Sequence, residues 1–274
     1  MIQKGEINKK ARANRVSDKQ IEKDYVLTWV LYGISENDVL KKFLAFKGGT
    51  VLKKAYFHDY RFSEDLDFTL LDESLTNEQI LDEFRESLEL VEEETAMSFR
   101  INEGSEKEHT PTGSFKFWIE YVAPLDGAMG SRDLKIDVTR GEKLEFDLSY
   151  RPLDNSYSDM SDINFTINCY SLAEVVIEKM TAVMGRTIPR DLYDLWYLFD
   201  SEQMDIEDYY FEFERKAEHK GHNPKEFRTK LLAKEGKYQR DWETSLGDQI
   251  YDLPKFKDVM RELNKHFRLL DKYE

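Results

Sequence analysis

The sequence is poor in cysteine and has no long hydrophobic run, and each absence excludes classes of protein. The single cysteine, Cys169, cannot form a disulfide within the chain or a CxxC zinc site, which fits a reducing compartment. We interpret it as a small buried hydrophobe. No apolar stretch approaches the roughly 20 residues that span a bilayer, and the basic N-terminus lacks the apolar core of a secretory signal. We therefore expect a cytoplasmic protein that does not enter a membrane.

Familiar catalytic patterns are also missing. No glycine-rich segment ends in the Lys-Ser or Lys-Thr pair of a Walker A loop. We interpret His58, which follows a Gly-Gly turn, as a loop residue. The other histidines lack the spacing of a catalytic triad or a zinc site: His109, His219, His222 and His266.

Positive charge is in short supply. The 274 residues include 55 acidic and 40 basic side chains, a formal charge of −15, and the mean hydropathy is −0.67. Such a protein is repelled by nucleic acid at long range, so binding RNA would need a local basic patch. The lysines at 41–54 and the basic residues at 216–234 are candidates, although both sets could be solvated helix faces. The acidic surface also suits a basic protein partner.

The most informative feature is a pair of carboxylates, Asp65 and Asp67, on a strand predicted over residues 65–70. Side chains two apart on a strand point the same way, with Cα atoms about 7 Å apart. The apolar residues that alternate with them favour burial of the opposite face. Like charges so placed repel unless a cation lies between them, and Mg²⁺ binds one or two carboxylates together with substrate phosphates.

A Gly-Gly turn precedes this strand. Gly48 and Gly49 would let backbone N–H groups approach phosphate oxygens, and a helix predicted over 51–56 would add its N-terminal dipole. By itself the glycine pair is better explained by an ordinary turn. The turn and the carboxylate strand together are more specific than either alone.

These residues carry a resemblance to a known family. Gly48-Gly49-Thr50, followed by Arg61-x-Ser63-x-Asp65-Leu66-Asp67-Phe68, resembles the first motif of the DNA polymerase β-like nucleotidyltransferase superfamily. The form is that of AbiEii/AbiGii toxins from type IV toxin–antitoxin and abortive-infection systems. Residues 21–25 resemble the family's opening helix, and residues 134–139, which include Asp137, resemble its second motif. Glu178-Lys179 with Arg186 resembles the third motif, and residues 190–194 resemble the fourth. The match spans roughly residues 20 to 200.

The resemblance implies a site. Asp65, Asp67 and Asp137 would bind Mg²⁺ or Mn²⁺, and a nucleoside triphosphate would be the substrate. Lys179 would bind phosphate. The residues implied around the nucleotide are Gly48, Gly49, Thr50, Arg61, Ser63 and Arg186. Either Asp137 or Asp191 would be the general base for the acceptor hydroxyl, with Asp194 in a supporting role.

Some of these residues have structural explanations of their own. Lys179 lies on the apolar stripe of a helix predicted over 172–184, where its stem either extends to the edge or its ammonium meets a buried anion. Asp191, in the first turn of the next helix, suits the helix dipole, and Arg186 suits the preceding helix C-terminus. Asp137 could be one acid on a solvent-facing strand.

The pattern along the chain predicts an α+β fold: a small mixed sheet with flanking helices, followed by a largely helical half. We expect a nucleotidyltransferase domain over residues 1–155 and a helical domain over 156–274 that contributes to the active site. Helices are expected at 21–34, 77–94, 172–184, 191–199, 206–217, 224–233 and 255–270, and further strands at 115–122, 134–138 and 165–167.

The family implies transfer of a nucleoside monophosphate to RNA, at the tRNA 3′ end, which arrests growth until a cognate antitoxin relieves it. Two rivals remain open. The same fold could modify a protein hydroxyl (AMPylation) or a small molecule, or the protein could bind nucleotide without catalysis and sequester a partner. Retention of the acidic residues and of Lys179 speaks against a decayed enzyme.

Overall fold

The structure is a computed structural model that describes residues 1–102, 106–109 and 112–273. Its chain divides into two compact units, Met1–Glu142 with Leu148–Tyr170, and Lys143–Asp147 with Ser171–Glu274. The main division between the units therefore follows Tyr170, after the last strand. The domain boundary expected at residue 155 stays a prediction. None of the described helices is long and apolar enough to cross a membrane.

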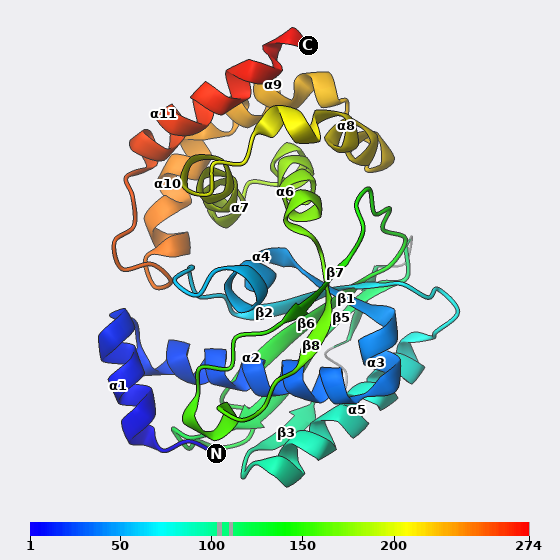
Figure 1. Ribbon diagram of the computed structural model, residues 1–274, viewed down its shortest axis with the longest axis vertical. Coiled ribbons are helices and arrows are strands. Elements are labelled where there is room, and N and C mark those ends of the chain that lie inside the picture. The colour runs from blue at the N-terminus through cyan, green and yellow to red at the C-terminus, as the bar shows by residue number, and fades with distance from the viewer. Residues whose placement is uncertain (103–105, 110–111, 274) are drawn as a thin grey trace. The chain divides into compact units, whose positions relative to one another are not determined.

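The first unit holds a mixed sheet with helices packed on it (Figure 1). Its helical segments are α1 (Lys4–Asn14), α2 (Asp18–Glu36), α3 (Asp38–Phe43), α4 (Gly48–Val51), the π-helical turn η1 (Leu52–Tyr56), α5 (Asn77–Glu94) and the 3₁₀ turn η2 (Ser158–Met160). Its strands are β1 (Leu44–Lys47), β2 (Asp65–Leu70), β3 (Ser98–Ile101), β4 (Lys107–His109), β5 (Ser114–Val122), β6 (Asp133–Thr139), β7 (Ser149–Pro152) and β8 (Thr166–Cys169).

The strand order is β3-β5-β6-β2-β1-β8-β7, with β4 paired to β5. The central strand β2 runs antiparallel to β1 and parallel to β6. This confirms the predicted mixed sheet, and it places the two strands that carry the predicted carboxylates side by side.

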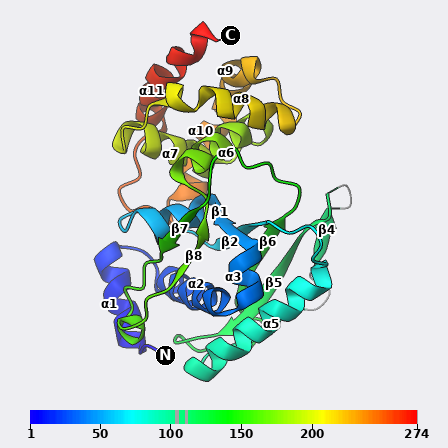
Figure 2. The same cartoon turned by 45° about the vertical axis from the view of Figure 1, so that its right-hand side comes forward.

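Helix α5 lies along one face of this sheet with α2 (Figure 2). Its Phe84 ring lies 6.4 Å from Phe68 on β2 and 5.1 Å from Phe117 on β5. Leu66 and Phe68 are fully buried, as the strand alternation predicts. Because neighbouring side chains on a strand point to opposite faces, Asp65 and Asp67 point away from α5.

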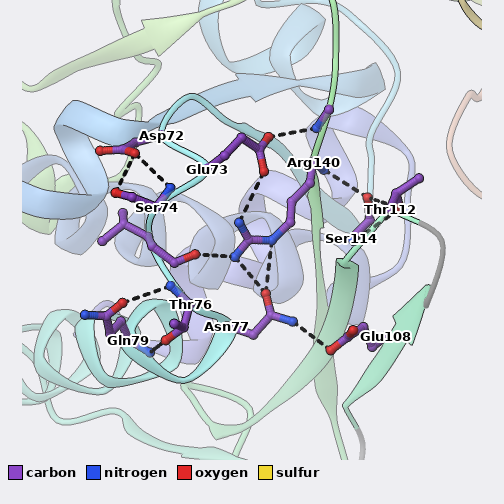
Figure 3. A network of polar contacts seen from close by, with 12 residues as sticks. Asp72, Glu73, Ser74, Thr76, Asn77, Gln79, Glu108, Thr112, Ser114 and Arg140 are labelled. Carbon is purple, nitrogen blue, oxygen red and sulfur yellow. Dashed lines mark hydrogen bonds and ion pairs between the residues drawn. The ribbon is translucent and has the colours of Figure 1, made fainter.

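Arg140 ties the ends of the two carboxylate strands together (Figure 3). It follows β6 and donates to the Leu75 carbonyl at 2.6 Å and to Asn77 Oδ1 at 2.9 Å, beyond the end of β2. Glu73 pairs with the guanidinium at 3.4 Å and accepts from the Gly141 N–H at 2.8 Å. The buried Arg140 thus helps fix the register between β2 and β6.

The second unit is helical. Its α-helices are α6 (Leu172–Gly185), α7 (Pro189–Trp196), α8 (Tyr210–His219), α9 (Phe227–Ala233), α10 (Glu235–Leu246) and α11 (Phe256–Phe267). A π-helical turn, η3 (Tyr197–Ser201), extends α7, and the 3₁₀ turns are η4 (Ile206–Tyr209), η5 (Pro224–Glu226) and η6 (Arg268–Lys272). Loop residues 143–147 belong to this unit: the carboxylate of Glu174 on α6 accepts from the Glu145 and Phe146 N–H groups, each at 2.9 Å.

The expected helices and strands are all present, with ends shifted by a few residues. Several elements were not expected: α1, α3, α10, β1, β3, β4 and β7. Among the missed strands, β3, β4 and β7 are short and include exposed positions, whereas β1 has four residues that are all buried. None of them offers a hydrophobic alternation long enough to detect.

Candidate active site

Four charged side chains form a grid on adjacent parallel strands. Asp65 lies opposite Lys135, and Asp67 lies opposite Asp137, in the register of β2 and β6. The Lys135 ammonium is 3.6 Å from Asp65 Oδ2 and 3.7 Å from Asp137 Oδ2. The structure therefore brings together the three predicted carboxylates, and it adds a lysine that sequence reasoning did not select.

Gly48 makes room for one of these carboxylates. Its φ of +78° lies in the left-handed region that favours glycine. A Cβ at this position would overlap Asp67 Oδ2 and would come within 3.1 Å of Asp67 Cγ. Glycine is thus needed at position 48 because the Asp67 carboxylate approaches it closely. The sequence alone explains this glycine only by contact with phosphate or by an ordinary turn.

Asp67 lies close to both acidic and basic side chains. Burial raises the pKa of its carboxyl group, and the neighbouring Asp137 and Asp65 raise it further, against the lowering effect of Lys135 and Lys47. Lys47 is the register partner of Asp67 on β1, and its ammonium also lies 3.5 Å from Glu142. The net direction of the pKa shift is upward, because burial is the largest effect and the two cations do not fully offset it.

Thr50 and Ser63 connect the glycine turn to the start of β2. Thr50 Oγ1 donates to the Asp65 carbonyl at 2.6 Å and lies 2.7 Å from Ser63 Oγ. Arg61 is only 4% exposed, so it is not the solvated loop residue that an isolated arginine usually is. Its guanidinium donates to the Phe62 carbonyl at 3.3 Å and lies against the Tyr60 ring. These three side chains brace the carboxylate strand.

The residues on the grid fit a hard divalent cation as donors. Carboxylate oxygens are the ligands that Mg²⁺ and Mn²⁺ prefer, and Mg²⁺ usually completes its shell with water and substrate phosphates. Within residues 1–102, 106–109 and 112–273, no three His, Cys, Asp or Glu side chains converge as a ready metal cage. The assignment of Asp65, Asp67 and Asp137 as metal ligands therefore remains a prediction, supported by chemistry and adjacency.

The basic patch considered near the turn is only partly exposed. Lys47, Lys53 and Lys54 are buried, whereas Lys41 is half-buried and Lys42 is exposed. Lys53 donates to the carbonyls of His58 and Tyr60, whereas Lys54 lies 2.8 Å from Asp24 Oδ2. These lysines anchor the polypeptide after the glycine turn, so they cannot form a continuous track for RNA.

A second charged cluster lies within the helical unit. The Lys179 ammonium is 2.8 Å from both Asp191 Oδ1 and Asp194 Oδ2. The Arg186 guanidinium donates to Asp191 Oδ2 at 2.7 Å and to Oδ1 at 3.0 Å. Lys179 therefore meets buried anions, the second of the two explanations considered, and these anions are side chains of the next helix.

The cluster balances its own charge. Burial alone would raise the pKa of Asp191, but the Lys179 and Arg186 cations lower it overall. Asp191 and Asp194 are almost fully buried, whereas the Arg186 side chain is 55% exposed. A carboxylate held in its charged form by two cations is a weak proton acceptor, which disfavours Asp191 as general base.

Sequence reasoning missed two side chains that touch or border the grid. Lys135 was visible as the residue two before Asp137 on the same strand face, and its charge was the available signal. Lys47 directly precedes the glycine pair. Its proximity to Asp67 depends on the β1–β2 pairing, which no local pattern specifies.

Comparisons with known proteins identify the family and support the fold. Residues 29–262 match the family model described as nucleotidyl transferase AbiEii toxin, type IV TA system. No curated protein matches the sequence significantly. The fold is similar to MenT4, a nucleotidyltransferase toxin of Mycobacterium tuberculosis H37Rv, with a TM-score of 0.67, 18% identity, and coverage of 98% of this chain and 90% of that one.

It is also similar to JHP933 from Helicobacter pylori, with a TM-score of 0.58, 15% identity, and coverage of 94% of each chain. At such identities the structural likeness supports the fold, and the family match supports the activity. The match spans most of the chain, and residues 48–194 lie within it. The chain belongs to the AbiEii nucleotidyltransferase toxin family of type IV toxin–antitoxin systems.

Proposed function

We propose that this nucleotidyltransferase transfers a nucleoside monophosphate from a nucleoside triphosphate to RNA, at the tRNA 3′ end, and so arrests growth. The observation that carries the proposal is the grid on β2 and β6, where three carboxylates face one contacting lysine beside the Gly48 turn. A cognate antitoxin would counter the effect. The family match supports the reaction class, and the RNA acceptor is part of the proposal.

In the proposed reaction the acceptor hydroxyl oxygen forms a bond to the α-phosphorus, and the bond from the α-phosphorus to the bridging oxygen breaks, releasing pyrophosphate. Asp65 and Asp67 would hold Mg²⁺ or Mn²⁺, which supplies charge neutralisation on the phosphates. Asp137 would accept the proton of the acceptor hydroxyl. Gly48, Gly49 and Thr50 would offer backbone N–H groups to the phosphates.

The remaining residues act by position and charge. Arg61 and Ser63 would keep the carboxylate strand in place, as their contacts near β2 suggest. Lys179 and Arg186 would provide positive charge for phosphate. Asp191 and Asp194 would hold the Lys179 ammonium in one orientation, which makes them positioning residues in this proposal.

The test is incubation of the purified protein with Mg²⁺, each α-³²P nucleoside triphosphate in turn and total cellular RNA. The intact protein should label RNA of tRNA size. Asp67→Asn should lower the label at least about a thousandfold, since charge neutralisation in the transition state is lost. Asp72→Asn is the matched control because this exposed acid bonds Ser74 at the end of β2, outside the grid.

Three results would contradict parts of the proposal. Label that survives RNase and is lost with protease would replace RNA by a protein hydroxyl as acceptor. Absence of label with every nucleotide would favour a non-catalytic nucleotide-binding protein. Growth arrest by Asp65→Ala and Asp67→Ala variants equal to that of the parent would show that toxicity does not require the grid.

A further inference from the structure

Lys135 makes the only ion pairs to the carboxylate trio that the described chain shows at the grid. Its ammonium lies between Asp65 and Asp137, at 3.6 and 3.7 Å. The lysine side chain is 27% exposed, and the two acids are 32% and 28% exposed. These contacts are longer than a hydrogen bond, so they represent charge attraction without fixed geometry.

Lys135 contacts two of the carboxylates that would hold a divalent ion. Lysine is a compact point charge on a flexible stem, and a partly exposed side chain has room to move. The Lys135 ammonium supplies one positive charge to three carboxylates, two of which it contacts, and Lys47 lies beside the third, Asp67. Two positive charges against three negative ones reduce the repulsion but leave a net negative face that still attracts a cation.

Lys116 provides an internal comparison. It is the register partner of Asp137 on β5, so it extends from the same face one strand further from Asp65. No ion pair joins Lys116 to any acid in the part of the chain that the structure describes, whereas Lys135 contacts two. Proximity on the sheet therefore does not by itself produce the bridge; the position of Lys135 on β6, opposite Asp65 on β2, does.

We propose that Lys135 is a built-in counter-ion that competes with the divalent metal for the carboxylates, so that metal binds weakly alone and more tightly together with the triphosphate. The inference rests on the proposed function for its ligands. A triphosphate brings several negative charges, which give the displaced ammonium a new partner and give the metal further oxygen ligands. Lys135 thereby couples metal binding to nucleotide binding.

Metal binding can be measured without any transfer reaction. We would titrate Mn²⁺ into the full chain by electron paramagnetic resonance, with and without an α,β-methylene nucleoside triphosphate, which the enzyme cannot cleave. Lys135→Met should bind Mn²⁺ about fivefold more tightly in the absence of nucleotide, the order expected for loss of one partly exposed ion pair. The tightening caused by the analogue should be about fivefold smaller in this variant than in the parent.

Matched variants separate this effect from a general change in charge. Lys116→Met removes the same charge from the same face and should change Mn²⁺ affinity less than twofold. Lys135→Arg keeps the charge and should behave like the parent. Lys135→Gln is the second neutral variant if Lys135→Met does not fold, which circular dichroism would detect.

The outcomes distinguish the inference from the proposed function. Equal Mn²⁺ affinity in the parent and both neutral variants would overturn the role of Lys135, and persistent RNA labelling by the parent would leave the function intact. If no form binds Mn²⁺, the inference also fails, because removal of a competitor should expose the site. Absence of RNA labelling by the parent in that case would remove the proposed function as well.

Discussion

The carboxylate grid of β2 and β6 and the Lys179 cluster of the helical unit combine the same kinds of residue with opposite charge balance. On the grid, Lys135 lies 3.6 Å from Asp65 and 3.7 Å from Asp137, two of the three aspartates, and these two acids are about a third exposed. In the helical cluster, Asp191 and Asp194 meet Lys179 at 2.8 Å and are almost fully buried. Arg186 adds a second cation to Asp191.

This difference supports the proposal that the grid recruits a cation, whereas the helical cluster already contains its own cations. Burial and neighbouring acids raise the pKa of Asp67, whereas cations lower the pKa of Asp191. A group whose charged form is disfavoured gains from an added positive ion, while a satisfied group gains little. The comparison supports the proposed metal binding by the grid and the proposed positioning role of the helical cluster.

The same substitution at the two lysines should have very different effects on stability. Lys179→Met would leave two buried carboxylates without their shared cation, which typically costs about 3–5 kcal/mol in the free energy of unfolding. Lys135→Met removes a partly exposed cation and should cost below about 1 kcal/mol. Urea unfolding of both variants, followed by circular dichroism, measures the difference.

A stable, inactive Lys179→Met protein would break the comparison. It would mean that the buried carboxylates tolerate loss of the cation and that Lys179 is needed chiefly by the substrate. Lys179→Arg is the control that keeps the charge. Arginine cannot reproduce a single ammonium between two carboxylates, so partial recovery of stability is the expected result.

The close approach of Asp67 to the turn gives a second prediction. Gly48→Ala would place a Cβ against the Asp67 carboxylate and would force a residue with a side chain to adopt φ +78°. We expect a loss of about 1–3 kcal/mol of stability from the backbone and the overlap together, and a larger proportional loss of transfer activity because Asp67 must move.

Gly5→Ala is the matched control within the same unit. Gly5 lies in α1, with nothing within 4 Å of an added Cβ, so alanine there should be neutral or slightly stabilising. Thermal unfolding and the RNA-labelling assay on both variants test the pair. Full activity of Gly48→Ala would show that the position of Asp67 is not needed for transfer.

The sequence predicts the fold well in segments that carry a clear periodic pattern of hydrophobic residues. The bounds of β2 and α5 agree with the prediction because alternating Leu66 and Phe68 and the capping residue Thr76 specify them locally. The short strands β3, β4 and β7 carried no comparable pattern and depend on pairing with distant partners.

The residues of the candidate site were likewise predictable only where a local pattern marks them. The acids of the grid were identifiable by motif and by alternation, as was Lys179 by its place on an apolar stripe. The contacts of Lys47 with the grid and of Arg140 with the loop after β2 arise from strand pairing and from segments more than 60 residues apart. The spacing of residues along the sequence does not indicate such contacts. The basic residues Lys47 and Arg140 were therefore less predictable than the carboxylates.

The smallest expected effect concerns acid stability, and it tests whether the helical cluster is satisfied by its own cations. The folded-state pKa of Asp191 is lowered, so its ion pairs contribute stability that is fully present above the unfolded value of about 3.9 and is lost as the pH falls through the lower folded value. Asp191→Asn should be less stable than the parent near neutral pH, and the gap should narrow below about pH 4 as the parent loses this contribution. Urea unfolding at a series of pH values measures both curves. A gap that stays constant down to the acid transition would mean that Asp191 gains nothing from Lys179 and Arg186, and the contrast with the grid would then lose its electrostatic basis.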